Sequence, residues 1–505
     1  MSLGSNHQKK YSGVLLHPTS LPGGSYCGTF GEATIEWLEL LSINNISSWQ
    51  FLPLSPTDSK GSPYSSPSSF AINPWLLDVN ELIKGKFICE TEETKKIKLD
   101  GEKLNFFEFK IADKLSTIVG NLLIESWESQ PTEIKNHFLY WCKKNNWVRD
   151  YSLFMSLKEN FKFSPWWNWP KELKLRNKEA IDQWEKTNPK SILIQKLIQW
   201  HLNRQWLKIK RIAEIKGIKL IGDLPFYVSK DSVDVWSNNS LFTISTTGDL
   251  SFQSGVPPDY FSSTGQLWGT PVYEWEKHKE TNFNWWKKRF KRQFELVDIL
   301  RLDHFRALES YWRIDGKAKN AMEGKWIQSP GKELLDSLKE FLELDTLPII
   351  AEDLGIINQE VINLRKKYSL PGMKILQFAF DGNEDNPYLP QNIHGDNWVV
   401  YTGTHDNSTT VSWWDQLEPN LKENIQNEYD LSDNPSWKLI ELGMKSRANL
   451  FIAPIQDILS LDDSSRTNKP GTIENNWKWK IRSTLNELKP SLEKYGNFSK
   501  RYFRY

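Results

Sequence analysis

At residues 297–305 the chain reads VDILRLDHF, a short run of β-prone apolar residues that ends in a polar cluster. Seven further runs of this kind occur: SGVLLHP (12–18), SSWQFLPL (47–54), IKLIGDLPF (218–226), PIIAEDLG (348–355), MKILQFAF (373–380), NWVVYTGTHD (397–406) and LFIAPIQD (450–457). Helical patterns lie between most of them, for example at 190–215, 331–343, 358–367 and 434–448. Eight strands that alternate with helices predict an α/β protein with a (β/α)₈ barrel of the TIM type. The main alternative is a doubly wound sheet, but no glycine-rich phosphate loop follows any of the runs.

The spacing of the runs predicts a large insertion between the second and third strands, over residues 55–217. Apolar residues recur there at helical spacing in 105–125, 133–146 and 149–161. We therefore expect a mainly helical insertion subdomain over residues 78–190.

A second excursion, residues 227–282, is rich in Ser, Thr, Gly, Pro and aromatic residues. This composition predicts a long ordered loop that covers the top face of the barrel. About fifty residues follow the eighth run, which is too few for a C-terminal β-sandwich. Residues 1–505 are accordingly interpreted as a single barrel domain with insertions.

Charge and composition exclude several classes of partner and cofactor. Lys and Arg (64) nearly balance Asp and Glu (63), which argues against nucleic acid or an anionic membrane as the main partner. No stretch approaches the ~20 apolar residues of a membrane span, and the N-terminus lacks the apolar run of a signal peptide. The three cysteines show no metal-type pairing, and neither a metal motif nor a dinucleotide or ATP motif occurs. We expect a cytoplasmic protein that uses no metal and no cofactor.

Tryptophan is unusually frequent, at 25 of 505 residues. Aromatic faces stack well on the apolar faces of sugar rings, so the excess suggests a carbohydrate ligand. Packing in the core is the alternative for most of these positions.

Three of the predicted strands end in acids: Asp303 in RLDHF, Glu352 in AEDLG and Asp406 in THDN. Each acid directly follows an apolar run, so a barrel would deliver all three to the same end. One such acid alone would more simply cap a helix or carry a solvated charge. Three of them, with Arg301 beside the first, favour a shared catalytic cleft. Glycoside chemistry needs such a cluster, because one carboxylate attacks while another stays protonated to donate to the leaving oxygen.

In this order, RLDHF, AEDLG and THDN resemble the signature of the α-amylase clan. Longer strings resemble its amylomaltase branch, glycoside hydrolase family 77: LLHPTSLPGG (15–24), SPYSSPSSFAINP (62–74), IGDLPFYVSKDSVDVW (221–236), GVPPDYFSSTGQLWGTPVY (255–273), GMKILQFAFDG (372–382) and NKPGTIENNWKWK (468–480). The resemblance extends from about residue 12 to the C-terminus and is least informative over residues 80–190.

The resemblance implies that Asp303 is the nucleophile, Glu352 the general acid and then base, and Asp406 the acid that binds the 2- and 3-hydroxyls of the distorted sugar. Arg301 lies two residues before the nucleophile, on the same face of its strand, and can hold Asp303 ionised. The other matches are substrate-binding positions: Tyr64 under the donor sugar, Asp223 on the third strand, His405 as a ligand of sugar hydroxyls, and Asp259, Tyr260, Phe261, Gln266, Trp268 and Asp381 on the covering loop and acceptor side.

The activity implied is that of a 4-α-glucanotransferase, which moves α-1,4-glucan segments from malto-oligosaccharides to the 4-hydroxyl of glucose or a glucan by retaining double displacement. One alternative is an α-amylase-like retaining hydrolase, which shares the same intermediate. Another is a catalytically dead glucan-binding barrel, which the presence of all three acids disfavours. The long 255–273 string and the missing C-terminal β-domain favour transfer over hydrolysis.

Overall fold

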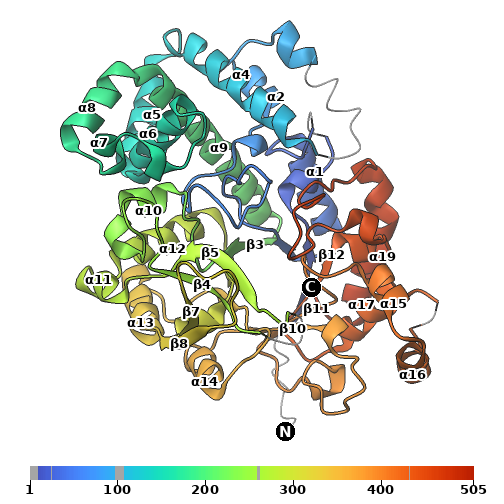
Figure 1. The fold of residues 1–505 in the computed structure, drawn as a ribbon. Helices are drawn as coiled ribbons and strands as arrows, with labels where there is room; N and C mark the ends of the chain where they lie inside the picture. The colour runs from blue at the N-terminus through green and yellow to red at the C-terminus, as the bar shows by residue number, and fades with distance from the viewer. Residues whose placement is uncertain (1–8, 24–25, 97–106, 259–261, 432) are drawn as a thin grey trace.

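The computed structural model describes residues 9–23, 26–96, 107–258, 262–431 and 433–505. Its central sheet has eight parallel strands: β1 (Tyr11–Leu15), β2 (Ser48–Gln50), β3 (Lys219–Leu224), β6 (Ile299–Leu302), β9 (Ile349–Ala351), β10 (Gly372–Ile375), β11 (Trp398–Tyr401) and β12 (Leu450–Pro454). Their order is β10-β11-β12-β1-β2-β3-β6-β9. The two ends of this order meet where Ala351 N donates to Pro371 O at 2.8 Å. The sheet is therefore a parallel barrel (Figure 1), and each of the eight predicted runs supplies one strand.

We call the C-terminal ends of the eight strands the rim of the barrel. Below the rim, an apolar layer fills the inside of the barrel. Its buried members are Leu15, Leu52, Ile221, Ile350, Met373, Ile375, Val399, Tyr401, Leu450 and Ile452. Because side chains alternate along a strand, Asp223 shares the inward face of β3 with Ile221, and Arg301 shares that of β6 with Ile299. Each of these two strands thus places an apolar side chain inside the barrel and a charged one two positions nearer the rim.

Helices surround the barrel and bury their apolar faces against the strands (Figure 1). They are α1 (Glu32–Ile43), α12 (Asn284–Leu296), α13 (Gly331–Leu342), α14 (Gln359–Lys367), α15 (Thr410–Gln416), α17 (Pro435–Lys445), α18 (Ile455–Ile458) and α19 (Leu485–Arg501). The short α16 (Pro419–Tyr429) lies farther out, at the edge of the molecule (Figure 1). Fourteen of the 25 tryptophans are buried, so core packing accounts for most of the tryptophan excess.

The insertion between β2 and β3 is helical, as predicted. It contains α2 (Val79–Lys84), α4 (Phe109–Trp127), α5 (Thr132–Lys144), α6 (Trp147–Asn160), α7 (Lys171–Lys174), α8 (Lys178–Thr187) and α9 (Pro189–Ile215). The 27-residue α9 belongs to both parts of the molecule, because it packs on α4, α5 and α6 and also on α1 and β3. Treating residues 78–190 as a separate subdomain remains a prediction.

A four-stranded antiparallel sheet lies beside the barrel, and the sequence pattern did not predict it. Its order is β5-β4-β7-β8, from β5 (Gln266–Pro271), β4 (Phe252–Val256), β7 (Ser310–Asp315) and β8 (Gly324–Gln328). Residues 227–282, interpreted above as a long loop, therefore contain two of its strands together with α10 (Val233–Ser237) and α11 (Trp275–Glu280). The central pairing was missed because β4 follows the third barrel strand while its partner β7 follows the fourth. The outer pairings join consecutive strands, β4 with β5 and β7 with β8, but their connections are longer than the two-residue turns that mark a hairpin in sequence.

After β12, the described residues form α18, α19 and irregular segments, and no β-sandwich occurs among them. The last helix, α19, is hydrogen-bonded to β1: Tyr495 Oη donates to Gly13 O at 2.8 Å, and the hydroxyls of Ser499 and Ser12 lie 2.7 Å apart. Within the described ranges, no helix has the length and apolarity needed to cross a membrane.

Candidate active site

Arg301 joins two acids at the rim of the barrel. Its Nη1 donates to Asp223 Oδ2 at 2.6 Å, and its Nη2 lies 3.0 Å from Asp303 Oδ1. The side chains of Arg301 and Asp223 are only 7% and 1% exposed, whereas that of Asp303 is 32% exposed. Burial raises the pKa of Asp223, and the facing guanidinium opposes this shift. Asp303 is therefore the member of the group that is open to a ligand.

Tyr64 binds the same cluster from the segment that follows β2. Its hydroxyl donates to Asp223 Oδ2 at 2.8 Å, and burial raises its pKa well above the ordinary value. Its ring stacks on that of His405, with centroids 5.3 Å apart and an interplanar angle of 8°. Trp477 completes an aromatic group, 5.9 Å from Tyr64 and 6.1 Å from His405. The structure thus brings Tyr64, His405 and the paired acids together, and it adds Trp477, to which the sequence assigned no role.

Glu352 follows β9 at the rim and accepts two backbone hydrogen bonds. His304 N donates to its Oε2 at 2.7 Å, and Leu354 N donates to its Oε1 at 3.0 Å. His304 adopts a left-handed backbone conformation, with φ of 53°, at the turn after β6. Burial raises the pKa of Glu352 to about 7, Asp303 adds to the rise, and Arg301 and the two N–H donors oppose it. A carboxyl with this pKa can hold a proton near neutral pH and release it in a reaction.

Asp406 lies on the loop after β11, and its side chain is 45% exposed. Its Oδ1 accepts a hydrogen bond from Asn468 Nδ2 at 2.6 Å and lies 3.3 Å from His405 Nε2. The sequence pattern did not single out Asn468, although it lies in the 468–480 string that carries part of the resemblance.

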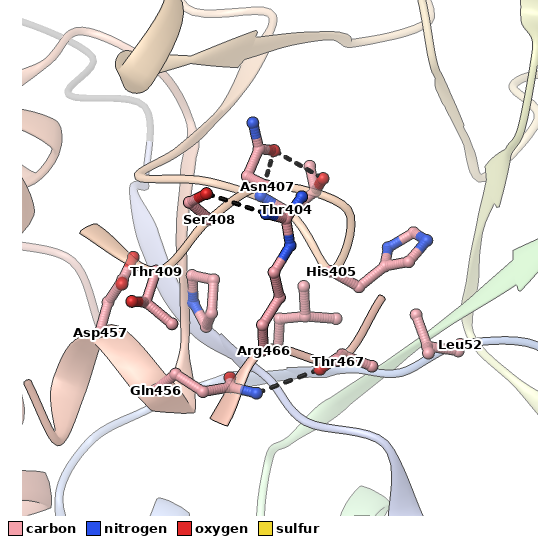
Figure 2. Close-up of a pocket in the computed structure, with 12 residues that line it drawn as sticks. Leu52, Thr404, His405, Asn407, Ser408, Thr409, Gln456, Asp457, Arg466 and Thr467 are labelled. Atoms are coloured by element: carbon pink, nitrogen blue, oxygen red, sulfur yellow. Dashed lines mark hydrogen bonds between the residues drawn. The ribbon is translucent and has the colours of Figure 1, made fainter. Parts of the chain in front are cut away.

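Two hollows flank these acids. One, of about 420 Å³, lies under the Asp406 loop between the ends of β1, β11 and β12, and Figure 2 shows His405, Asn407, Ser408 and Arg466 in its wall. The second, also about 420 Å³, is lined by Tyr64 and Asp223. Asp223 therefore borders one concave surface, and the residues on either side of Asp406 border the other, as in a ligand site.

The antiparallel sheet brings a further aromatic side chain close to the turn that follows β6. Trp268, 37% exposed, lies on β5 with its ring centroid 4.9 Å from that of His304 and 5.9 Å from that of Tyr227. Gln266 Oε1 accepts a hydrogen bond from Trp268 Nε1 at 3.2 Å. Burial lowers the pKa of His304 to about 4, so this imidazole is neutral at pH 7.

The remaining predicted positions are less well placed. Asp381 is exposed on the loop after β10, where its carboxylate accepts a hydrogen bond from Asn383 N at 3.0 Å. No contact with the other site residues is recorded for it in the described part of the chain. Asp259, Tyr260 and Phe261 lie outside the described residues. Across the described ranges, no group of three or more His, Cys, Asp or Glu side chains could hold a metal ion.

Carboxyl groups with different surroundings at the C-terminal end of a parallel barrel are the arrangement that enzymes acting on glycosidic bonds use. The family model described as 4-alpha-glucanotransferase, glycoside hydrolase family 77, matches residues 16–486. The chain therefore belongs to this family, and the predicted resemblance is confirmed.

Relatives and solved structures agree with this membership. The 4-alpha-glucanotransferase of Synechocystis sp. is 41% identical over 476 residues, 94% of each chain. That of Thermus thermophilus is 37% identical over 479 residues, covering 93% of this chain and 94% of the relative. Among solved structures, amylomaltase from Streptococcus agalactiae in complex with acarbose matches with a TM-score of 0.92 and 31% identity, over 98% of this chain and 100% of that one.

Proposed function

We propose that this enzyme transfers α-1,4-glucan segments from a donor malto-oligosaccharide to the 4-hydroxyl of a glucose or glucan acceptor. Asp303 serves as nucleophile, Glu352 as general acid and base, and Asp406 as the group that stabilises the transition state. The observation that carries this assignment is the difference between two carboxyls of one rim: Asp303 faces a guanidinium at 3.0 Å, while burial raises the pKa of Glu352 to about 7. One is suited to attack as an anion and the other to deliver a proton.

The reaction has two steps. Asp303 forms a bond to the anomeric carbon of the donor while the glycosidic C–O bond breaks, and Glu352 gives its proton to the leaving oxygen. In the second step the acceptor hydroxyl attacks the same carbon, Glu352 removes its proton, and Asp303 departs as a carboxylate. Retaining chemistry of this kind needs the two carboxyls about 5–5.5 Å apart when the substrate is bound. Both steps conserve charge and need no cofactor.

Substrate binding follows from the same surroundings. Tyr64 and His405, stacked at 5.3 Å, offer an aromatic wall and ring nitrogens to the donor sugar. The acceptor side is assigned to Trp268, Gln266 and Asp381. The resemblance adds Asp259, Tyr260 and Phe261, which lie outside the described residues. Two effects would favour a sugar hydroxyl over water as the second nucleophile. Residues on the acceptor side exclude water, and oriented attack by a bound acceptor can lower the barrier by about 7 kcal/mol or more.

The experiment is incubation of the protein with maltotriose alone. A transferase forms glucose together with a ladder of longer malto-oligosaccharides. Short products alone would indicate a hydrolase, and unchanged maltotriose would indicate a glucan-binding protein. Neither alternative is favoured by the family membership.

Folded Asp303→Asn should form no product, and wild-type activity in that variant would refute the assignment of the nucleophile. Labelled glucose added to the mixture should enter the ladder if glucose is an acceptor. A cytoplasmic location remains a prediction.

A further inference from the structure

The third acid of the rim is held by a segment that the reaction scheme above does not use. Asn468 lies 62 positions after Asp406, yet its Nδ2 donates to Asp406 Oδ1 at 2.6 Å. Its backbone N–H also donates to His405 O, at 3.1 Å. Asn468, which lies in the segment after β12, therefore holds both a carboxylate oxygen of Asp406 and the backbone carbonyl of the preceding residue, His405.

Arg466 anchors Asn468 to the loop after β11. Its Nε donates to Asn468 O at 2.8 Å, its Nη1 donates to Ser408 Oγ at 2.9 Å, and its Nη2 donates to Asp406 O. Figure 2 shows the guanidinium inside the hollow, between Ser408 and the loop that carries Thr404 and Asn407. Because one planar cation spans both segments, Asn468 cannot shift without moving the backbone of Asp406.

The two oxygens of Asp406 have different surroundings. Oδ1 receives the Asn468 amide and lies 3.3 Å from His405 Nε2. For Oδ2, no donor is recorded among residues 9–23, 26–96, 107–258, 262–431 and 433–505, and the side chain is 45% exposed. The amide is therefore placed to fix the carboxylate by one oxygen and to leave the other for a ligand.

We propose that Asn468 is a positioning residue, which holds Asp406 Oδ1 so that Oδ2 faces the sugar; this rests on the role proposed above for Asp406. A neutral amide suits the task. It orients the carboxylate without cancelling the negative charge that must stabilise an oxocarbenium-like transition state. A lysine or arginine at the same place would pair with that charge and weaken it.

The charged and titratable groups that face this contact come from three segments. His405 adjoins Asp406 on its own loop, and Tyr64 faces the same carboxylate from the segment after β2. Arg466 lies behind it, with Asp463 at 3.6 Å from its Nη1. A new carboxyl at position 468 would therefore meet Asp406 directly.

Asn468→Asp tests the contact through pH. At low pH the new carboxyl is protonated and can still donate to Asp406 Oδ1. As pH rises the proton is lost, two carboxylates face each other, and the hydrogen bond disappears. Activity on maltotriose should fall on the alkaline side earlier than in the wild type, by about one pH unit or more. A pH profile identical to that of the wild type would overturn the proposal.

Asn468→Ala tests the same contact without new charge. It should lower kcat by about 10- to 100-fold with little change in KM, because misplacement of a catalytic group mainly affects the transition state. The matched control is Asn476→Ala. Asn476 Nδ2 donates to Thr472 O at 2.9 Å, and its Oδ1 accepts a hydrogen bond from Lys469 N at 2.9 Å. Its loss therefore loosens the same segment next to Asn468 but leaves the hydrogen bond from the Asn468 amide to Asp406 in place.

Equal loss of kcat in the Asn468→Ala and Asn476→Ala proteins would mean that the segment is merely structural, and unchanged kcat in Asn468→Ala would also overturn the proposal. Asp406→Asn separates this from the proposed function. If Asp406→Asn is fully active, the role of Asp406 itself is wrong. If Asp406→Asn is inactive while Asn468→Ala is normal, only the positioning role fails.

Discussion

Replacing Arg301 with methionine should lower the free energy of unfolding by about 3–5 kcal/mol, because it removes one partner from a buried ion pair. The magnitude follows from the surroundings of Asp223, whose side chain is 1% exposed and whose Oδ2 receives Arg301 Nη1 at 2.6 Å. Without the guanidinium, only the Tyr64 hydroxyl, at 2.8 Å, remains to stabilise this charge. Asp303 contributes less to the loss, because at 32% exposure water can replace its partner.

The assay is urea unfolding at pH 7, followed by tryptophan fluorescence. Adding Asp223→Asn to Arg301→Met should restore about half or more of the lost stability, since the neutral amide removes the uncompensated buried charge and still accepts from Tyr64. The control is Lys438→Met, which breaks an ion pair of the same 2.6 Å length whose partner Asp430 is 75% exposed, and it should leave stability nearly unchanged. If Arg301→Met is no less stable than Lys438→Met, or if Asp223→Asn restores none of the lost stability, Arg301 does not compensate a buried charge on Asp223.

Three further outcomes are expected. First, kcat/KM should fall about tenfold per unit as pH rises above about 7, because Glu352 must be protonated to act as acid; a rate that is flat to pH 9 would contradict this role. The same raised pKa means that the contribution of Glu352 to stability is full below its ordinary value of 4.5 and is lost as pH rises through about 7, which urea unfolding of Glu352→Gln at pH 5 and 8 would measure. Second, Tyr64→Phe should lower the free energy of unfolding by about 1.5–3 kcal/mol through the lost bond to Asp223, yet raise KM for maltotriose far less than Tyr64→Ala, because the stacked ring is kept. Third, Trp268→Ala should raise the ratio of reducing ends formed to disproportionation products on maltotriose; an unchanged ratio with both rates reduced would show that the ring only binds substrate.

The barrel and its three strand-end acids could be predicted because they depend on local pattern. Asp303, Glu352 and Asp406 each follow an apolar run, and a parallel barrel places all such ends on one rim. Arg301 could be added because alternation along β6 puts it on the inward face. The positions of these residues follow from their own strands and do not depend on contacts with distant segments.

The parts that were missed depend on contacts between distant segments. The pairing of β4 with β7 joins residues about sixty positions apart. The connections of β4 to β5 and of β7 to β8 are longer than the two-residue turns that would mark a hairpin in sequence. Asn468 reaches Asp406 across 62 positions, and an asparagine beside a proline-containing loop looks in sequence like an ordinary turn residue. The left-handed turn at His304, which aims a backbone N–H at Glu352, was also missed, because no glycine marks this turn in the sequence.

The position of Asp223 explains how one guanidinium can serve a rim that needs two protonation states. Arg301 lowers the pKa of Glu352, and burial raises it by more, so that the carboxyl reaches about 7. Burial alone would lower the pKa of Arg301, but the carboxylates of Asp223 and Asp303 raise it well above the ordinary value, which keeps the guanidinium charged. That charge is shared chiefly with Asp223 at 2.6 Å and Asp303 at 3.0 Å. Without Asp223, a negative charge that offsets the guanidinium would be missing. The pKa of Glu352 would then fall, which favours loss of the proton that the proposed first step requires. In the proposed mechanism, the buried acid on β3 thus lets Asp303 keep a cationic partner while Glu352 remains protonated.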